Sequence, residues 1–483
     1  MFRGEPRREE EPDVPDSLCH HTATDLSALI REREVSAREV MQAHLDRIEL
    51  LNPKVNALVS VDPERALAAA ASADEWLASG APVGPLHGLP IAHKDTHDSA
   101  GIRTTYGSPL LADNVPDRDE LVVERLKAAG TIVMGKTNVP EFAAGSHTFN
   151  PVFGTTANPY ALDRSAGGSS GGAAASLACR MQPLADGSDM GGSLRNPASF
   201  CNVVGLRPAP GRVPTWPDLA AWSTLSVQGP MARTVSDVAL MLSAIAGPDD
   251  RSPIAISEPG SVFQGSLEAD LSGLRVAFSM DLDGELVVAP QVRAVLEPAA
   301  QVLTDIGGAV EEAAPDLTGA DEVFRTLRAW QFELALGELR DAHPDRIKPS
   351  LRDNIDAGRA LTGADVGRAE RLHAELYHRV REFFGRYDVL ALPVSQVPPF
   401  DIDLEFPTEI GGVAMPSYLD WMRSAYWISA TGCPAISVPA GFTPQGLPVG
   451  LQLVAPHRGE RRLLEVAHAF ERATQHAAVL PQL

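Results

Sequence analysis

Residues 165–177 read SAGGSSGGAAASL, a run of glycine and serine that leads directly into alanine. Glycine adopts backbone angles that cost other residues energy, so such a loop lets the main chain approach a ligand closely. The alanines predict a helix, whose first turn offers free N–H groups and a favourable dipole. The segment therefore predicts a loop and a helix N-terminus beside a binding or catalytic site.

A second loop of the same kind follows at residues 187–197, which read GSDMGGSLRNP. Consecutive glycines before a serine can direct several N–H groups at one point, which is what the stabilisation of an oxyanion requires. Two such loops close together in the chain favour acyl-transfer chemistry with a serine nucleophile.

A base for that serine is offered by residues 88–95, GLPIAHKD, where Lys94 ends an apolar strand. A serine hydroxyl becomes a useful nucleophile only beside a base. Lysine is a base only when it is neutral, and burial away from a fixed anionic partner lowers its pKa towards that state. Taken by itself, Lys94 would be interpreted as a solvated lysine at a strand end.

Together the three segments resemble the amidase signature family, whose catalytic unit is a Ser–cis-Ser–Lys triad. The spacing of Lys94, Ser169 and Ser193 matches that family. Further similarity is found in GKTN at 135–138, EF at 141–142, NP at 158–159, VGLRP at 204–208, GPM at 229–231, PAISVP at 434–439 and GLPVG at 446–450. The resemblance covers most of the chain and is weakest over residues 257–424.

The resemblance implies a role for each residue of the triad. Ser193 is expected to attack the substrate carbonyl, Ser169 to relay the proton to the leaving nitrogen, and neutral Lys94 to accept and return it. The peptide bond before Ser169 is expected to be cis. The expected oxyanion donors are the backbone N–H groups of Met190, Gly191, Gly192 and Ser193, and the expected supporting residues are Ser170, Asp189 and Arg195. The resemblance implies neither a metal nor an organic cofactor.

Alternating strand and helix patterns predict an α/β fold. Strands are expected at 55–61, 89–92, 131–134, 274–278, 389–393, 435–438 and 449–454, and helices at 40–51, 63–77, 120–129, 234–246, 290–305 and 460–471. Residues 320–386 are predicted to be mainly helical without chemical motifs, and residues 397–427 to be irregular and to shape a pocket. We therefore expect the amidase signature fold, a central twisted β-sheet, mostly parallel or mixed, covered by helices on both faces. Residues 1–21 are expected to form a flexible N-terminal tail, and residues 22–483 a single domain.

Composition excludes several other classes of protein. The chain has 483 residues, a formal net charge of −22 and no run of lysine or arginine, which disfavours a nucleic-acid or anionic-membrane surface. Its four cysteines, Cys19, Cys179, Cys201 and Cys433, fit neither a disulfide framework nor a C-x-x-C metal pattern and are expected to be buried in a reducing compartment. The first twenty residues lack the apolar core of a signal peptide, and a cytoplasmic protein is expected.

Three other motifs compete with this interpretation. Residues 130–137, GTIVMGKT, match the letters of a Walker A loop, but their middle is an apolar strand rather than a flexible phosphate cradle. GSSGG at 168–172 matches the nucleophile elbow of α/β hydrolases with Ser170 as nucleophile, but residues 161–165 ahead of it are not expected to form a strand. His93 and His97 have the spacing of two imidazoles on one helix face, but the segment looks extended, so a metal site is not expected.

The resemblance implies an enzyme that hydrolyses carboxylic amides of small molecules through a seryl acyl-enzyme, with aryl amides, esters and carbamates as open substrate classes. It leaves open whether the chain forms a homodimer. The alternative is the A subunit of a tRNA-dependent glutamine amidotransferase complex. Met190 and the segment WPDLAAW at 216–222 depart from the usual pattern of that relative, which favours a stand-alone amidase. Aromatic residues that could build the substrate pocket are Phe149, Phe153, Trp216, Trp222, Phe400, Phe406, Tyr418, Trp421, Tyr426 and Trp427.

Overall fold

The computed structural model describes residues 18–483. Residues 1–17 of the predicted tail lie outside the described residues. The last residues of that predicted tail pack against the rest of the chain: Cys19 is buried, and the carbonyl of His21 accepts a hydrogen bond from the guanidinium of Arg233. The division into a flexible tail and one domain stays a prediction.

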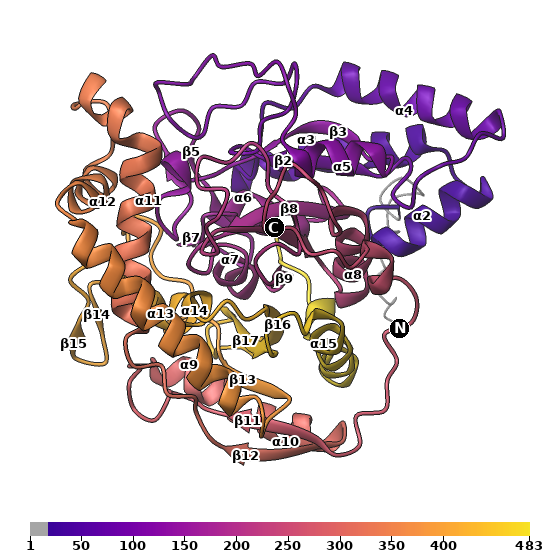
Figure 1. Cartoon of the computed structure of the whole chain (residues 1–483). Helices are drawn as coiled ribbons and strands as arrows, with labels where there is room; N and C mark the ends of the chain where they lie inside the picture. The colour runs from indigo at the N-terminus through magenta and orange to yellow at the C-terminus, as the bar shows by residue number, and fades with distance from the viewer. Residues whose placement is uncertain (1–17) are drawn as a thin grey trace, which may run out of the picture.

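A mixed eight-stranded sheet forms the centre of the molecule (Figure 1). Its strand order is β12-β11-β13-β17-β16-β9-β10-β8. The strands span Leu184–Asp189 (β8), Val204–Arg207 (β9), Val227–Ala232 (β10), Leu274–Phe278 (β11), Gly308–Glu312 (β12), Val389–Pro393 (β13), Ala435–Phe442 (β16) and Pro448–Val454 (β17). Strand β11 pairs in parallel with β12 and β13, and the other pairs are antiparallel. The predicted mixed sheet is confirmed, with parallel pairing confined to one end.

A smaller sheet of order β1-β3-β2 carries the candidate lysine. Its strands span Leu58–Val59 (β1), Pro90–Lys94 (β2) and Ile132–Thr137 (β3). Strand β2 also lies beside β8 of the large sheet, where side chains join the two strands. Gln182 accepts a hydrogen bond from the N–H of Ala92 (2.7 Å), and Asp186 accepts one from the N–H of Lys94 (2.7 Å). The last residue of β2 is therefore fixed next to the strand that leads into the second glycine loop.

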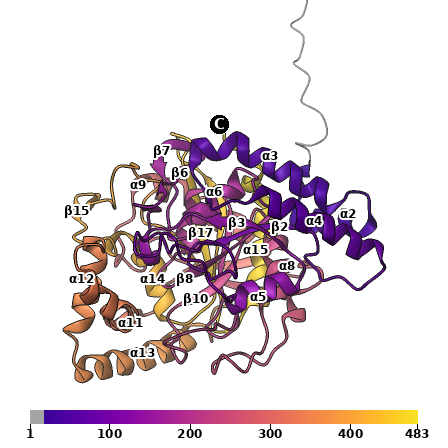
Figure 2. The ribbon, with the colours of Figure 1, turned by 90° about the horizontal axis from the view of Figure 1, so that it is seen from above.

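Helices cover the sheets, as predicted. Figures 1 and 2 place α2, α3 and α4 together at one end of the molecule and α11, α12 and α13 at another. The helices span Ala23–Glu32 (α2), Ala37–Val55 (α3), Pro63–Ala78 (α4), Leu121–Ala128 (α5), Gly171–Ala178 (α6), Arg195–Phe200 (α7), Val235–Ile245 (α8), Pro290–Leu296 (α9), Ala299–Asp305 (α10), Ala320–Ala342 (α11), Pro349–Arg359 (α12), Gly363–Phe383 (α13), Arg423–Ala430 (α14) and Glu460–Thr474 (α15). The mainly helical character of residues 320–386 is thereby confirmed.

Two predicted helix boundaries are wrong, and both errors lie at prolines. Helix α3 begins after Ser36, whose side chain forms a capping box with Glu39, but it continues past Pro53 to Val55. A proline in the last turn removes one backbone hydrogen bond while the turn itself persists. The helix predicted over 290–305 is instead interrupted at Pro298 and becomes α9 and α10, because proline has no N–H with which to continue the ladder.

The expectation that residues 161–165 are not a strand is also wrong. They form β7 (Ala161–Ser165), which pairs with β6 (Ala157–Asn158) in a local two-stranded ribbon. Most of β7 is exposed or half-buried, so it lacks the apolar run by which buried strands are recognised. The run predicted to be irregular, 397–427, contains β14 (Glu409–Ile410), β15 (Val413–Ala414) and the start of α14. Two further short strands, β4 (Phe149–Asn150) and β5 (Gly154–Thr155), pair with each other.

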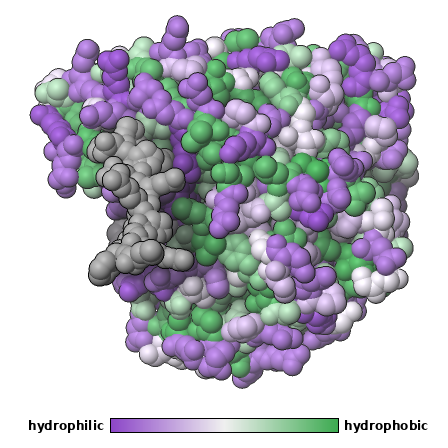
Figure 3. Space-filling view, turned by 180° about the vertical axis from the view of Figure 1, so that it is seen from behind, coloured by the Kyte–Doolittle hydropathy of each residue, from purple (hydrophilic) through white to green (hydrophobic). Residues whose placement is uncertain are grey.

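The core surrounds the glycine loops. Every residue of α6 is buried, including the alanines at 173–175, because small side chains let this helix enter the interior of the molecule. All four cysteines are buried, as predicted, and none of them forms a disulfide within residues 18–483. The face seen in Figure 3 mixes hydrophilic and hydrophobic side chains. Within residues 18–483, no helix is both long and apolar enough to span a membrane.

Candidate active site

Lys94 lies at the centre of a cluster of serine hydroxyls. Its side chain is fully buried at the end of β2. The Nζ atom lies 2.8 Å from Ser169 Oγ, 3.0 Å from Ser170 Oγ and 2.9 Å from Ser188 Oγ. The structure thus brings Lys94 into direct contact with Ser169. Ser188, which sequence reasoning did not single out, adds a third hydroxyl from the end of β8.

Burial lowers the pKa of Lys94 to about 7, because the ammonium form loses its hydration. The charges of Asp189, Asp186 and Glu120 act in the opposite direction. Among residues 18–483, however, the direct hydrogen-bond partners of Nζ are the three neutral hydroxyls and no carboxylate. A large fraction of Lys94 is therefore neutral at physiological pH, the form that can accept a proton.

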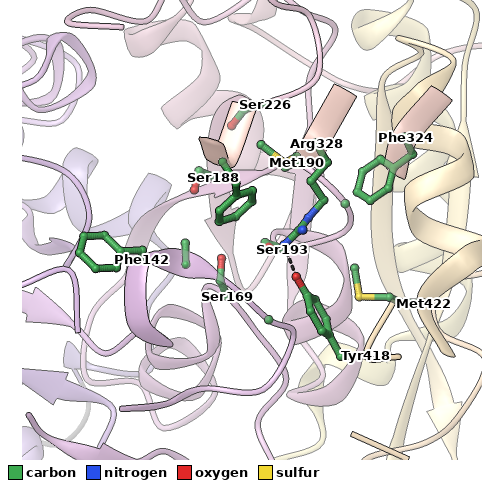
Figure 4. A pocket seen from close by; sticks show the side chains of 14 residues that line it. Phe142, Ser169, Ser188, Met190, Ser193, Ser226, Phe324, Arg328, Tyr418 and Met422 are labelled. Carbon is green, nitrogen blue, oxygen red and sulfur yellow. Dashed lines mark hydrogen bonds between the residues drawn. The ribbon is translucent and has the colours of Figure 1, made fainter. Parts of the chain in front are cut away.

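Ser193 lies on the loop between β8 and α7, where it shares a cavity of about 150 Å³ with Ser169 (Figure 4). Ser193 is half-buried, and its carbonyl accepts a hydrogen bond from the N–H of Ser170 (3.3 Å). The peptide bond between Gly168 and Ser169 is cis, as expected. The two glycine loops are therefore in direct contact, and Ser169 from the first loop lines the same cavity as Ser188 and Ser193 from the second.

The backbone N–H groups before Ser193 differ in what they contact. The N–H of Gly192 donates to Asp189 Oδ1 (2.8 Å), so it is already engaged. Gly192 has a φ of +118°, a conformation that other residues adopt only with strain. Within the described chain, the N–H groups of Met190, Gly191 and Ser193 have no protein partner. These three remain free to act as donors to a bound oxygen, whereas Gly192 instead shapes the turn.

Asp189 organises the loop that carries Ser193 from inside the protein. Its fully buried carboxylate accepts hydrogen bonds from the N–H groups of Gly192 and Leu194, and it pairs with Arg195 (2.9 Å) and Arg207 (3.3 Å). Burial by itself would raise the pKa of this carboxyl, but the two guanidinium groups hold the pKa far below its usual range. Asp189 is therefore a buried anion shared by the loop and two buried cations.

We expect Asp189→Asn to destabilise the fold strongly. The substitution keeps the shape of the side chain but leaves Arg195 and Arg207 without their shared carboxylate. Removing one partner of a buried ion pair costs about 3–5 kcal/mol. Urea unfolding followed by circular dichroism measures the loss. As a control, Asp163→Asn breaks an exposed pair with Arg164 and should cost at most about 1 kcal/mol; similar losses in both variants would contradict the structural role of Asp189.

The outer wall of the cavity comes from segments far along the chain. Helix α11 contributes Phe324, Arg328 and Phe332, which lie on successive turns of one face, and the run 397–427 contributes Tyr418 and Met422. Sequence reasoning did not assign these side chains of α11 to the cavity, because bulky side chains at i, i+4 and i+8 occur on any packed helix. The prediction that residues 397–427 shape a pocket is confirmed by Tyr418 and Met422.

A second cavity of about 360 Å³ adjoins the first and shares Phe142, Ser188 and Met190 with it. Residues 217–220 of the tryptophan-containing segment line this second cavity, together with Glu120. Met190 stands where the two cavities meet. Ser169 and Ser193 line only the first of these two adjoining cavities, and Ser188 lines both.

The Walker-type motif forms part of a sheet. Residues 132–137 are strand β3, and the Nζ of buried Lys136 donates to the carbonyl of His97 and lies 3.0 Å from Ser99 Oγ. Its lysine is therefore directed into the protein, where it holds the chain after β2, and not towards a phosphate cradle.

The residues of the other two competing motifs contact either Lys94 or the neighbouring Asp186. Ser170 is fully buried and contacts Lys94 rather than a histidine, so it lacks the partner that a nucleophile elbow needs. His93 Nδ1 lies 2.5 Å from Asp186 Oδ2, and His97 Nδ1 lies 3.5 Å from Asp186 Oδ1. Both histidines thus face Asp186, the residue that accepts the hydrogen bond from the N–H of Lys94.

The chain is similar to known proteins along nearly its whole length. The model of the family described as Amidase matches residues 39–464. An acylamidase from Rhodococcus erythropolis is 36% identical over 93% of this chain and 94% of its own length. The A subunit of the glutamyl-tRNA(Gln) amidotransferase of Methylococcus capsulatus is 35% identical over 94% of this chain and 97% of its own. Among solved structures, a bacterial aryl acylamidase of the amidase signature enzymes superposes with a TM-score of 0.88 at 28% identity, covering 95% of this chain and 98% of the other.

Proposed function

Because the chain belongs to the amidase signature family, we propose that it hydrolyses carboxylic amide bonds through a seryl acyl-enzyme. The observation that carries this proposal is the contact of 2.8 Å between Lys94 Nζ and Ser169 Oγ beside the cavity that Ser169 shares with Ser193. A buried lysine with a pKa of about 7 is suited to act as a base at neutral pH.

In the first half of the proposed reaction, Ser193 Oγ attacks the carbonyl carbon of the amide. The proton of Ser193 passes to Ser169 Oγ, and the proton of Ser169 passes to Lys94 Nζ. The free N–H groups of Met190, Gly191 and Ser193 donate to the oxyanion, and each important donor of this kind contributes on the order of 3 kcal/mol to the transition state. Lys94 then returns the proton through Ser169 to the leaving nitrogen, and the amine departs.

In the second half, water attacks the acyl group bound to Ser193. Its proton travels to Lys94 through Ser169 and returns to Ser193 Oγ when the carboxylic acid leaves. The net reaction consumes one water and one amide and yields one acid and one amine. Ser170 and Ser188 hold Lys94 Nζ in place, which keeps the base beside Ser169 during both halves.

Amides with small acyl and aryl groups are the substrates that we propose, with phenyl esters and carbamates as weaker candidates. Phe142, Phe324 and Phe332 give the cavity aromatic walls, and the similarity to an acylamidase and an aryl acylamidase supports the same choice. A panel of anilides, aliphatic amides, phenyl esters and carbamates tests the proposal. The absence of any amide hydrolysis above that of the Ser193→Ala variant would contradict it. The four buried cysteines, none of which forms a disulfide within residues 18–483, support a cytoplasmic location for this activity.

Activity should rise with pH through neutrality. Only neutral Lys94 accepts a proton, and its pKa is about 7, so kcat/KM should fall about tenfold for each pH unit below that value and level off above it. The rate of anilide hydrolysis, measured from mildly acidic to mildly alkaline pH, checks this. A profile that is flat or falls through this range would contradict the role of Lys94.

The variant Glu120→Gln distinguishes whether Lys94 or a second titrating group nearby causes the pH dependence of activity. Burial raises the pKa of Glu120 to about 7 as well, and Glu120 lines the second cavity. In Glu120→Gln the rise of activity with pH should remain, because Lys94 still titrates. If the rise disappears in that variant, Glu120 and not Lys94 controls the reaction.

A second candidate function is the A subunit of a tRNA-dependent glutamine amidotransferase. The 35% identity to such a protein over nearly the full length of both chains favours it. Met190 and the segment 216–222 depart from the usual pattern of that subunit, which favours a stand-alone enzyme. Purified alone, the protein should hydrolyse simple amides. Release of ammonia from glutamine that depends on a co-purifying partner would instead support the amidotransferase role.

A further inference from the structure

Arg328 places a positive charge in the wall of the catalytic cavity. Only 5% of its surface is exposed, and it shares the cavity with Ser169 and Ser193. Phe324 and Phe332 stand one turn before and one turn after it on α11, so one face of that helix presents an aromatic, a cationic and an aromatic side chain. In Figure 4 the side chain of Arg328 extends towards Tyr418.

The protein supplies this guanidinium with neutral partners. One terminal nitrogen donates to Tyr418 Oη and the other to Asn354 Oδ1. The centre of the guanidinium lies 4.2 Å from the ring centroid of Phe332 and 5.3 Å from that of Tyr418. Among residues 18–483, no carboxylate oxygen lies within the 4.0 Å that defines an ion pair with Arg328.

Several other arginines of the chain have the anion that Arg328 lacks. Arg195 and Arg207 share Asp189. Arg325, one turn earlier on α11, pairs with Asp321 and Asp420. A buried charge without a counter-charge is costly, and a carboxylate that docks in a two-pronged arrangement is the group that best matches a guanidinium. Arginine stays charged at all physiological pH values, so the cavity keeps this unpaired cation in the free enzyme.

We propose that Arg328 selects substrates that carry a carboxylate close to the scissile amide bond. This inference rests on the proposed function and names its substrate class. The cavity of about 150 Å³ holds both the serines and Arg328, so only a short spacer fits between the amide and the carboxylate. The aromatic rings beside Arg328 exclude water from that contact, which strengthens it.

Two pairs of anilides of matched shape test the proposal. Succinanilate is compared with N-phenylsuccinamide, which places the charge on the acyl side, and 4-acetamidobenzoate with 4-acetamidobenzamide, which places it on the amine side. A hydrogen-bonded contact to a charged partner changes binding by about ten- to a hundredfold. We expect kcat/KM to favour the carboxylate by this factor in at least one pair. In Arg328→Gln the ratio of kcat/KM between the carboxylate and its neutral partner should fall to about one through a higher KM for the carboxylate, and Arg328→Lys should fall between.

Arg325→Gln is the control variant, because Arg325 already has carboxylate partners and does not line the cavity. It should keep the full preference. Hydrolysis of the neutral and charged members of both pairs at equal rates by the wild-type enzyme would overturn the inference while leaving the proposed function intact, and this comparison needs no variant.

If the enzyme hydrolyses no amide, the proposed function fails and calorimetric binding of the same compounds decides the inference. Tighter binding of one carboxylate than of its neutral partner, lost in Arg328→Gln, would support the site. Equal or undetectable binding of the members of both pairs would overturn it.

Discussion

Replacing Ser193 by alanine is expected to abolish amide hydrolysis. The substitution removes the hydroxyl that attacks the carbonyl, and loss of a serine nucleophile lowers kcat on the order of 10⁴- to 10⁶-fold. Folding should be unaffected, because Ser193 is half-buried and the hydrogen bond that joins its loop to Ser170 uses the backbone carbonyl. Steady-state hydrolysis of an anilide and the thermal unfolding midpoint measure the two effects.

Ser226→Ala provides the comparison. Ser226 is an exposed serine at the rim of both cavities and has no contact with Lys94. This variant should keep most of the activity. Residual hydrolysis near the wild-type rate in pure Ser193→Ala would show that Ser193 is not the nucleophile, and an equal loss in both variants would point to a general effect on the cavity.

Lys94→Met is expected to have the next largest effect. Methionine fills the buried space but cannot accept the proton of Ser169, and removal of a general base costs about 10²- to 10⁴-fold in rate. The variant also removes the only titrating group assigned to the reaction, so its residual activity should no longer rise through pH 7. Activity and its pH profile are measured on the folded fraction of the protein.

Lys136→Met separates chemistry from folding. Lys136 is a second fully buried lysine, on the neighbouring strand β3, with its Nζ on the carbonyl of His97. Its loss should lower stability, because that carbonyl loses its donor, while each folded molecule keeps its activity and pH profile. A loss of activity per folded molecule as large as that in Lys94→Met would argue that Lys94 acts through packing.

The candidate catalytic serines could be predicted from the sequence because they lie in loops of unusual composition, whereas Lys94, at the end of β2, was assigned through the family resemblance. Glycine next to serine in two nearby segments indicates close backbone approach, and the structure brings Lys94 to the first of these loops. Gly187 illustrates the constraint: a Cβ there would lie 2.7 Å from Ser170 Oγ. The cis bond before Ser169 followed from the family resemblance and not from the composition of the loop.

The errors occur where the sequence pattern does not distinguish between two local structures. Strand β7 is polar and pairs locally, so its alternation gives no apolar signal. Pro53 and Pro298 look alike in sequence, but one lies in a last helical turn and the other separates two helices. In the same way, the engagement of the Gly192 N–H by Asp189 could not be predicted from the run of residues 187–197.

The sequence by itself determined two glycine–serine loops and an α/β pattern, because each depends on residues that are neighbours in the chain, and the family resemblance added Lys94 to the candidate site. The tertiary structure alone decided what surrounds that site. The burial that lowers the pKa of Lys94 and the arrival of Arg328 from α11 depend on segments distant in sequence. The electrostatic interactions and the solvent exposure of a titratable group depend on all its neighbours in space. The local sequence does not specify those neighbours.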